Sequence, residues 1–164
     1  MPTPLRATLD ELLALRDPQG VLTIYVDEQP ELGRRHRPRG GELVLRSRLH
    51  ELRERVRAEG PGERGRLLDE RLDELAGRLS DAVDPALAGG GRAFFVPLSD
   101  GRVREEAAVR AMGDEVALED SALLMPLVAA LVEEEPAGLV VLTAEGVRAV
   151  EVRGADVEEV VQED

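Results

Sequence analysis

The feature that most constrains this chain is a short apolar segment, Gly20-Val21-Leu22-Thr23-Ile24-Tyr25-Val26-Asp27. Its central residues are apolar or β-branched, and turn-forming residues flank it: Gly20 before it, and Pro30 and Gly33 after it. A short run of this kind, rich in Val, Ile and Tyr, predicts a strand that is buried on both faces. Such a strand lies in the middle of a sheet that helices cover.

A second apolar strand is predicted from Arg92 to Leu98, with Phe94 and Phe95 on opposite faces because side chains alternate along a strand. The segment Ser99-Asp100-Gly101-Arg102 that follows is typical of a tight hairpin turn. We therefore expect the chain to return beside this strand, over 103–109, as a more polar strand nearer the edge of the sheet.

Two long helices are predicted between these strands, over 42–58 and 63–83. In each of them leucine recurs at steps of three and four residues, which places the leucines on one face. Arg and Glu occupy the other faces. We expect the two helices to pair as an antiparallel hairpin against the sheet.

Shorter helices are predicted on either side of this central part. Thr8 and Glu11 have the spacing of a capping box, which predicts a helix that opens at Thr8 and lies at the edge of the sheet. Asp120 or Ser121 is expected to cap another helix, which runs to Leu131. Pro126 either lies in the first turn of this helix or marks where its regular part starts.

The last part of the chain changes character, with apolar runs at 138–143, 147–152 and 157–161 separated by short turns. They predict a three-strand meander, which cannot close a core without a covering layer. The meander therefore either joins the preceding sheet or opens a second unit. The fold class predicted from the whole sequence is α+β (α/β-like): a mixed sheet with helices packed on it, including a helical hairpin, followed by a C-terminal β-meander.

The inventory of reactive residues argues against an enzyme. The absence of Cys excludes thiolate metal sites and cysteine nucleophiles. His36 and His50 are the candidates for a base at neutral pH, and Glu54 lies one helical turn after His50. Two such groups do not complete a metal site, which needs three or more ligands. We expect no catalytic residues, no metal and no cofactor in this chain.

Charge is distributed unevenly along the chain. The net charge is −13, which argues against broad binding to nucleic acid. Residues 31–60, however, carry nine Arg against five Glu, a local charge of +4, whereas residues 105–164 carry sixteen acids against three Arg, a local charge of −13. Aromatic residues are scarce, so stacking of nucleic-acid bases on exposed rings is not expected.

Four arginines in the segment 28–41 form the one stretch with a contact role that the sequence itself suggests: Arg34, Arg35, Arg37 and Arg39. A guanidinium group can donate to two phosphate oxygens at once, so these residues are candidates for RNA binding. The alternative is a surface loop whose positive charge offsets an acidic body. The sequence leaves both interpretations open.

The order of these elements resembles the N-terminal part of bacterial relatives of the archaeal and eukaryotic class-1 peptide-chain release factor. The resemblance rests on strand 20–27, the helical hairpin, Gly91-Arg92-Ala93-Phe94-Phe95-Val96 at the opening of a hairpin, and Leu124-Met125-Pro126-Leu127-Val128 on a helix. The run Leu-Val-Val-Leu-Thr-Ala-Glu-Gly-Val-Arg-Ala-Val-Glu-Val, 139–152, looks like the opening strands of the family's middle domain. The resemblance thus implies a release-factor-like N-terminal domain over 1–136 and the first strands of an incomplete middle domain over 137–164.

In release factors the N-terminal domain reads the stop codon, and a Gly-Gly-Gln loop in the middle domain places water on the peptidyl-tRNA ester. Neither activity carries over to these residues. The sequence stops before such a loop would come, and the codon-reading motifs of the eukaryotic proteins are not visible in it. Gly89-Gly90-Gly91 lies elsewhere in the chain and lacks the Gln. The resemblance implies a ribosome-associated protein of translation termination, rescue or hibernation that binds ribosomal RNA or tRNA and does not itself catalyse a reaction.

A second hypothesis is a protein-interaction or self-association domain, such as a homodimer formed through exposed strands, with no RNA contact. Both hypotheses place the protein in the cytoplasm. No apolar run approaches the roughly 20 residues needed to cross a bilayer, and the N-terminus lacks the apolar core of a signal peptide.

Overall fold

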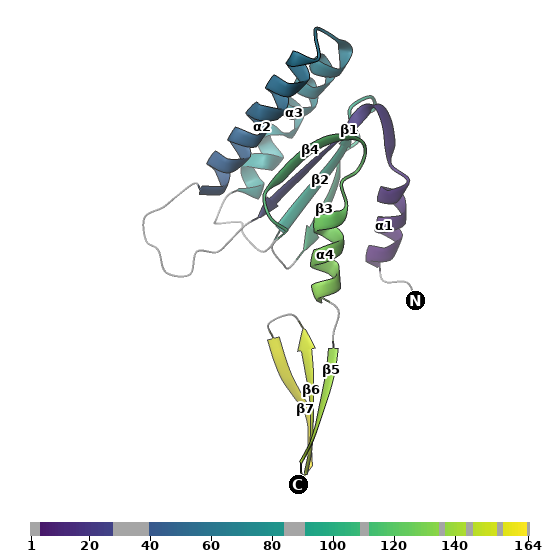
Figure 1. Ribbon diagram of the computed structural model, residues 1–164, viewed down its shortest axis with the longest axis vertical. Helices are drawn as coiled ribbons and strands as arrows, with labels where there is room; N and C mark the ends of the chain where they lie inside the picture. The colour runs from purple at the N-terminus through teal and green to yellow at the C-terminus, as the bar shows by residue number, and fades with distance from the viewer. Residues whose placement is uncertain are drawn as a thin grey trace.

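A computed structural model describes residues 4–27, 40–83, 91–108, 112–134, 137–143, 146–153 and 156–163 of the chain (Figure 1). Side chains are described for most of the first four ranges and for few residues beyond 134. The elements in chain order are α1 (Pro4–Leu13), β1 (Arg16–Asp27), α2 (Gly40–Ala58), α3 (Glu63–Ala82), β2 (Gly91–Pro97), β3 (Arg104–Ala108), β4 (Glu115–Ser121), α4 (Met125–Glu134), β5 (Ala137–Thr143), β6 (Gly146–Arg153) and β7 (Asp156–Glu163).

The strands form two separate sheets, and the predicted α+β class is confirmed. The first sheet has four strands in the order β3-β2-β1-β4, so β1 lies inside it, and the second has the order β5-β6-β7. Every pairing is antiparallel, whereas we expected a mixture of strand directions. The predicted C-terminal meander is present as its own sheet, which lies beyond the end of α4 in Figure 1.

Strand β1 is buried on both faces, as its apolar sequence predicts. Leu22, Ile24 and Val26 belong to the apolar cluster under the helical hairpin, whereas Tyr25 belongs to a second cluster on the opposite face. Thr23, on the same face as Tyr25, is also buried. Each fully buried aliphatic or aromatic side chain of this kind contributes about 1.5–3 kcal/mol to stability, so this strand is a major source of folding free energy.

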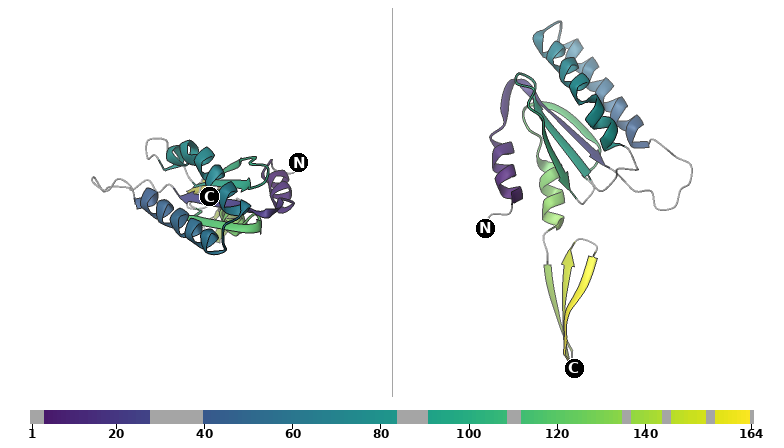
Figure 2. Two further views of the ribbon diagram at one scale, coloured as in Figure 1. Left: turned by 90° about the horizontal axis from the view of Figure 1, so that it is seen from above. Right: turned by 180° about the vertical axis from the view of Figure 1, so that it is seen from behind.

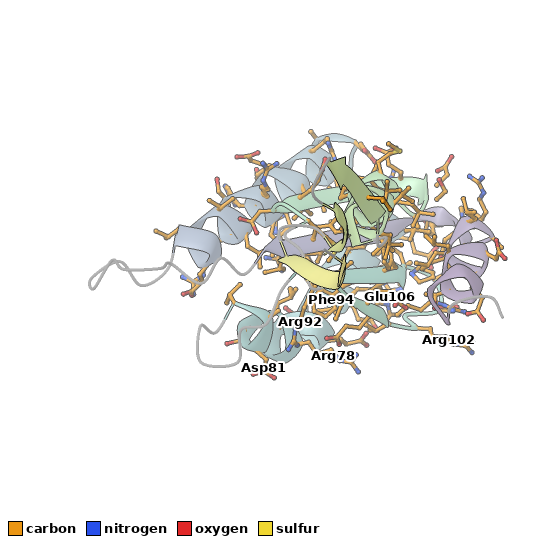
Figure 3. The ribbon with its side chains drawn as sticks, turned by 90° about the horizontal axis from the view of Figure 1, so that it is seen from below. Arg78, Asp81, Arg92, Phe94, Arg102 and Glu106 are labelled. Carbon is orange, nitrogen blue, oxygen red and sulfur yellow. The ribbon has the colours of Figure 1, made fainter. Side chains whose placement is uncertain are left out.

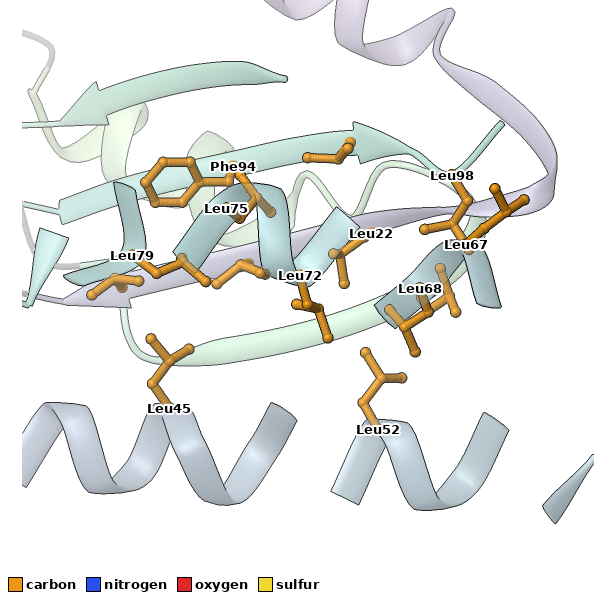
Figure 4. Packing of buried hydrophobic residues seen from close by; sticks show 14 of the residues in the cluster. Leu22, Leu45, Leu52, Leu67, Leu68, Leu72, Leu75, Leu79, Phe94 and Leu98 are labelled. Carbon is orange, nitrogen blue, oxygen red and sulfur yellow. The ribbon is translucent and has the colours of Figure 1, made fainter. Parts of the chain in front are cut away.

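The helical hairpin of α2 and α3 covers one face of the four-stranded sheet. Its bounds are close to those predicted from the leucine periodicity. Leu45 and Leu52 of α2 and Leu68, Leu72 and Leu75 of α3 are buried in the same cluster. Figure 4 shows these leucines directed toward Leu22 and Phe94 of the sheet.

Helices α1 and α4 cover the other face (Figure 2). Leu12 of α1 and Leu127 of α4 are buried there with Tyr25 and Phe95. Phe94 and Phe95 therefore point into different clusters, as predicted, and the rings of Tyr25 and Phe95 meet edge to face with centroids 5.9 Å apart. The four-stranded part of the molecule is a sheet between two helical layers.

Two predicted helix starts are wrong. The first helix begins at Pro4 and not at Thr8, because proline is favoured in the first turn, where its missing N–H costs no hydrogen bond. The last helix begins at Met125 and not after Asp120 or Ser121, and Pro126 lies in its first turn, as predicted. Those two residues belong to β4, where Ser121 pairs with Arg16.

An irregular stretch at the start of β1 is fixed by the Asp17 carboxylate. The register against β4 shifts between Arg16 and Val21. Asp17 is only 4% exposed, and its side chain accepts hydrogen bonds from the Gln19 N–H at 2.7 Å and from the Ser99 N–H and hydroxyl at 2.8 Å each. Burial acts to raise the pKa of Asp17, but the bonds from Ser99 and Gln19 outweigh it, so this pKa lies below its ordinary value.

Polar groups of β1 also hold the connection between β4 and α4. The Tyr25 hydroxyl donates to the Leu123 carbonyl at 2.6 Å, and the Thr23 hydroxyl accepts from the Leu123 N–H at 3.2 Å. Burial raises the pKa of the Tyr25 hydroxyl, which therefore remains a donor at neutral pH. Both backbone groups of Leu123 are thus satisfied by a single strand.

We expect Asp17→Asn to lower the free energy of unfolding by about 1–3 kcal/mol at pH 7, because an amide nitrogen would face donors that now reach a carboxylate. The folded-state pKa of Asp17 lies below the unfolded value. Its contribution is therefore complete above the unfolded pKa and disappears as the pH falls through the folded pKa. Urea unfolding of both proteins between pH 7 and pH 2 measures this, and a difference that stays constant over that range would contradict it.

We expect Tyr25→Phe to destabilise the fold by about 1–2 kcal/mol, because the carbonyl of Leu123 loses its donor in a buried position. Chemical denaturation measures the change. Thr23→Val is the matched variant, since it removes the acceptor for the N–H of the same residue. A stability unchanged in both variants would show that β1 does not hold this connection.

Candidate functional site

The four arginines predicted to bind RNA, Arg34, Arg35, Arg37 and Arg39, lie outside the described residues. What the structure describes is the place where their segment joins the fold. The segment starts after Asp27, which pairs with Gly91 of β2, and it ends where α2 begins at Gly40. In Figure 1 the end of β1 and the start of α2 lie toward the same end of the four-stranded sheet.

A small cluster of charged residues lies near this end of the sheet. Arg92 of β2 pairs in register with Val26, one residue before the end of β1. Its side chain contacts Glu105 of β3 at 3.3 Å, and Arg78 of α3 contacts the other oxygen of Glu105 at 3.5 Å. Figure 3 shows Arg78 and Arg92 near one another. Two guanidinium groups thus share one carboxylate, which leaves a net positive charge beside the arginine-rich segment.

Sequence reasoning did not single out Arg78 or Arg92, because fourteen positions separate them along the chain. The antiparallel pairing of β2 with β3, and the packing of α3 over the sheet, bring them together. One weak sign of a role for Arg92 was present in the sequence, since it is the one charged residue in the apolar run that forms β2.

An open groove of about 350 Å³ runs between α2 and α3. Its floor is apolar and includes Leu49 and Leu79. Arginines of α2 stand at its rim, but Arg46 pairs with Glu42 at 2.7 Å and Arg53 pairs with Asp69 at 2.9 Å. Each of these two guanidinium groups has its own acidic partner, so the pairs leave no net positive charge at the rim.

No group of three or more His, Asp or Glu side chains that could hold a metal ion occurs among the residues that the structure describes. His50 is exposed on α2, and Glu54 contacts Arg57 at 2.9 Å. His36 lies outside the described residues.

Two partly buried groups, Glu106 and Arg71, have pKa values displaced by contacts that join elements of the fold. Burial raises the pKa of Glu106 on β3, nearby Arg104 opposes this rise, and Glu11 of α1 adds to it. Arg104 itself forms an ion pair with Glu11, which joins β3 to α1. On α3, the hydrogen bond to Glu74 raises the pKa of Arg71, whose Nε also donates to the Leu98 carbonyl at 3.1 Å.

None of the helices in the described part of the chain combines the length and the apolar character that crossing a bilayer requires.

Comparison with known proteins shows the fold. No family profile and no curated protein matches the chain. Among solved structures, the crystal structure of the archaeal translation termination factor aRF1 matches with a TM-score of 0.53 and 13% sequence identity, covering 96% of this chain and 43% of that one. A second structure, described as an archaeal protein, matches with a TM-score of 0.53 and 14% identity, over the same shares of the two chains.

The chain spans less than half the length of these two structures, and the identity is low. The likeness therefore shows the fold alone, and the fold is release-factor-like. This bears out the coarser part of the resemblance predicted from the sequence.

Proposed function

We propose that this chain is a ribosome-associated part of a release-factor-like protein, which acts in translation termination, rescue or hibernation in the cytoplasm. The observation that carries the proposal is the likeness of its fold to the archaeal termination factor over 96% of the chain. Within this proposal the chain belongs with the bacterial relatives of the archaeal and eukaryotic factors. Its contribution is to bind the ribosome, through ribosomal RNA or tRNA.

The proposed division is a first domain over 1–136 and the opening strands of a middle domain over 137–164. One feature supports it. The strands β5, β6 and β7 pair with one another and with no strand of the first sheet in the described part of the chain.

Binding without catalysis is part of the proposal. Hydrolysis of peptidyl-tRNA by release factors uses a Gly-Gly-Gln loop, and that tripeptide does not occur in residues 1–164. Arg34, Arg35, Arg37 and Arg39 remain the candidates for RNA contact. Strand β1, from which their segment follows, ends beside Arg92, which shares the Glu105 carboxylate with Arg78.

A second candidate function is self-association through exposed strand edges. The edge strand β5 has the sequence Ala-Gly-Leu-Val-Val-Leu-Thr, with no charge and no proline, and Val140 within it is 61% exposed. Uncharged edges of this kind tend to pair with further strands. The opposite edge strand, β7, carries four acidic residues, which disfavour pairing between copies.

For the proposed function we expect the chain to co-sediment with ribosomes at low salt, and R34A/R35A/R37A/R39A to weaken this binding. The slope of log affinity against log salt should fall by about 3, because each lost phosphate contact removes about 0.7–0.9. The control R46A/R57A/R66A/R102A removes the same charge from exposed arginines elsewhere. Failure of the unaltered chain to bind ribosomes at low salt would refute the proposal, and equal loss in both variants would refute the role of the segment.

For the second candidate, we expect light scattering at high concentration to show a dimer that V140K converts to a monomer, since a charge on the strand opposes pairing. V132K is the matched control, because Val132 of α4 has a similar exposure of 64%. A protein that stays monomeric at high concentration removes this candidate and leaves the ribosome-binding proposal standing.

A further inference from the structure

Two arginines of the helical hairpin differ from the others. Seven of its nine arginines lie within 4 Å of an acidic side chain: Arg46, Arg53, Arg57, Arg64, Arg66, Arg71 and Arg78. Arg48 and Arg55, both exposed on α2, have no such partner among the described residues. Their guanidinium groups are therefore the hairpin cations left available to another molecule.

Arg48 and Arg55 lie on one flank of α2. Seven residues are about two helical turns, so the two side chains project in similar directions about 10 Å apart along the axis. Arg46 and Arg53 are also seven residues apart, but they line the groove toward α3. With Leu52 directed into the core, Arg48 and Arg55 project from the other flank, on the side where α2 packs beside β4.

Glu51 is the acid best placed along the helix to neutralise both arginines, since it follows Arg48 by three residues and precedes Arg55 by four. It forms an ion pair with neither one. Its carboxylate instead accepts a hydrogen bond from the Ser47 hydroxyl at 3.1 Å. This flank of α2 is thus polar, and its two guanidinium groups have no ion-pair partner among the described residues, although the Glu51 carboxylate lies between them.

We propose that Arg48 and Arg55 form a phosphate-contact site for an RNA backbone on the flank of α2, a site that rests on the proposed function and extends it beyond the segment 34–39. Arginine suits phosphate because its planar fork can donate two hydrogen bonds to one phosphate group. Contacts of this kind position an RNA without reading its bases, which agrees with the scarcity of aromatic residues.

An RNA fits this flank better than an acidic protein does. Protein interfaces are organised around a desolvated core of large apolar and aromatic residues. Between Arg48 and Arg55 this flank exposes Glu51, and its one large apolar residue, Val44, lies a turn before Arg48 and is 41% exposed, which is too little apolar surface for such a core. Both arginines also belong to residues 31–60, whose local charge is +4 in a chain of net charge −13. The site therefore continues the arginine-rich region of the sequence.

The test measures binding of the full chain to a fluorescein-labelled 20-nucleotide oligouridine and to purified ribosomes over a range of salt concentrations. We expect R48Q/R55Q to weaken oligouridine binding several-fold and to lower the salt slope by about 1.5. The matched control R57Q/R66Q removes two exposed arginines that acids already neutralise, and it should lose less than half as much. R48K/R55K keeps the charge and should retain most of the slope, and thermal melts check that all variants fold.

Equal losses in R48Q/R55Q and R57Q/R66Q would overturn the assignment, because the effect would then follow net charge alone. Competition by polyglutamate as strong as that by unlabelled oligouridine would point to an acidic protein and would also overturn it. If R48Q/R55Q binds ribosomes and oligouridine normally while R34A/R35A/R37A/R39A does not, this inference fails and the proposed function stands. If the unaltered chain binds neither probe, the proposed function itself fails.

Discussion

Burial of β1 on both faces is the constraint on which the rest of the four-stranded fold depends. A strand whose Leu22, Ile24 and Val26 point one way and whose Tyr25 points the other needs an apolar layer on each side. The α2–α3 hairpin supplies one layer, and α1 with α4 supplies the other (Figure 2). Neighbouring strands satisfy its backbone groups, since β2 and β4 pair with it along both edges. Charged side chains other than Asp17 are thereby left mainly to the outer surfaces of the helices and the edges of the sheet.

The polar residues inside this arrangement fix connections that apolar packing leaves undetermined. Apolar contacts are not directional, so they do not decide where a strand bends or how a loop enters a helix. Asp17 joins the start of β1 to Ser99 through a buried carboxylate. Tyr25 and Thr23 hold Leu123 at the entry to α4. The bonds of Asp17 lie at the irregular start of β1, and those of Tyr25 and Thr23 lie at the connection between β4 and α4.

The same arrangement divides the arginines of the helical hairpin into those with an acidic partner and those without one. Most of those on the helical hairpin are neutralised by acids of the hairpin or of β3, as Arg53 is by Asp69 and Arg78 is by Glu105. Arg48 and Arg55 are not, although Glu51 lies within one turn of each. An acidic protein with a few uncompensated guanidinium groups can bind a phosphate chain locally while its net charge limits non-specific binding. The proposed ribosome-binding role is consistent with that electrostatic pattern.

The α+β class, the strand at 21–26, the hairpin of two leucine-faced helices and the C-terminal meander could all be predicted from residue order, because periodicity and turn residues are local properties. The predicted starts of α1 and α4 were displaced, since Pro4 in the first turn and the pairing of Ser121 with Arg16 outweighed the capping signals. The all-antiparallel strand order, the role of Asp17 and the meeting of Arg78 with Arg92 emerge only in the folded chain. Each of these depends on groups far apart in the chain, whose approach is set by register and packing and leaves no local pattern in the sequence.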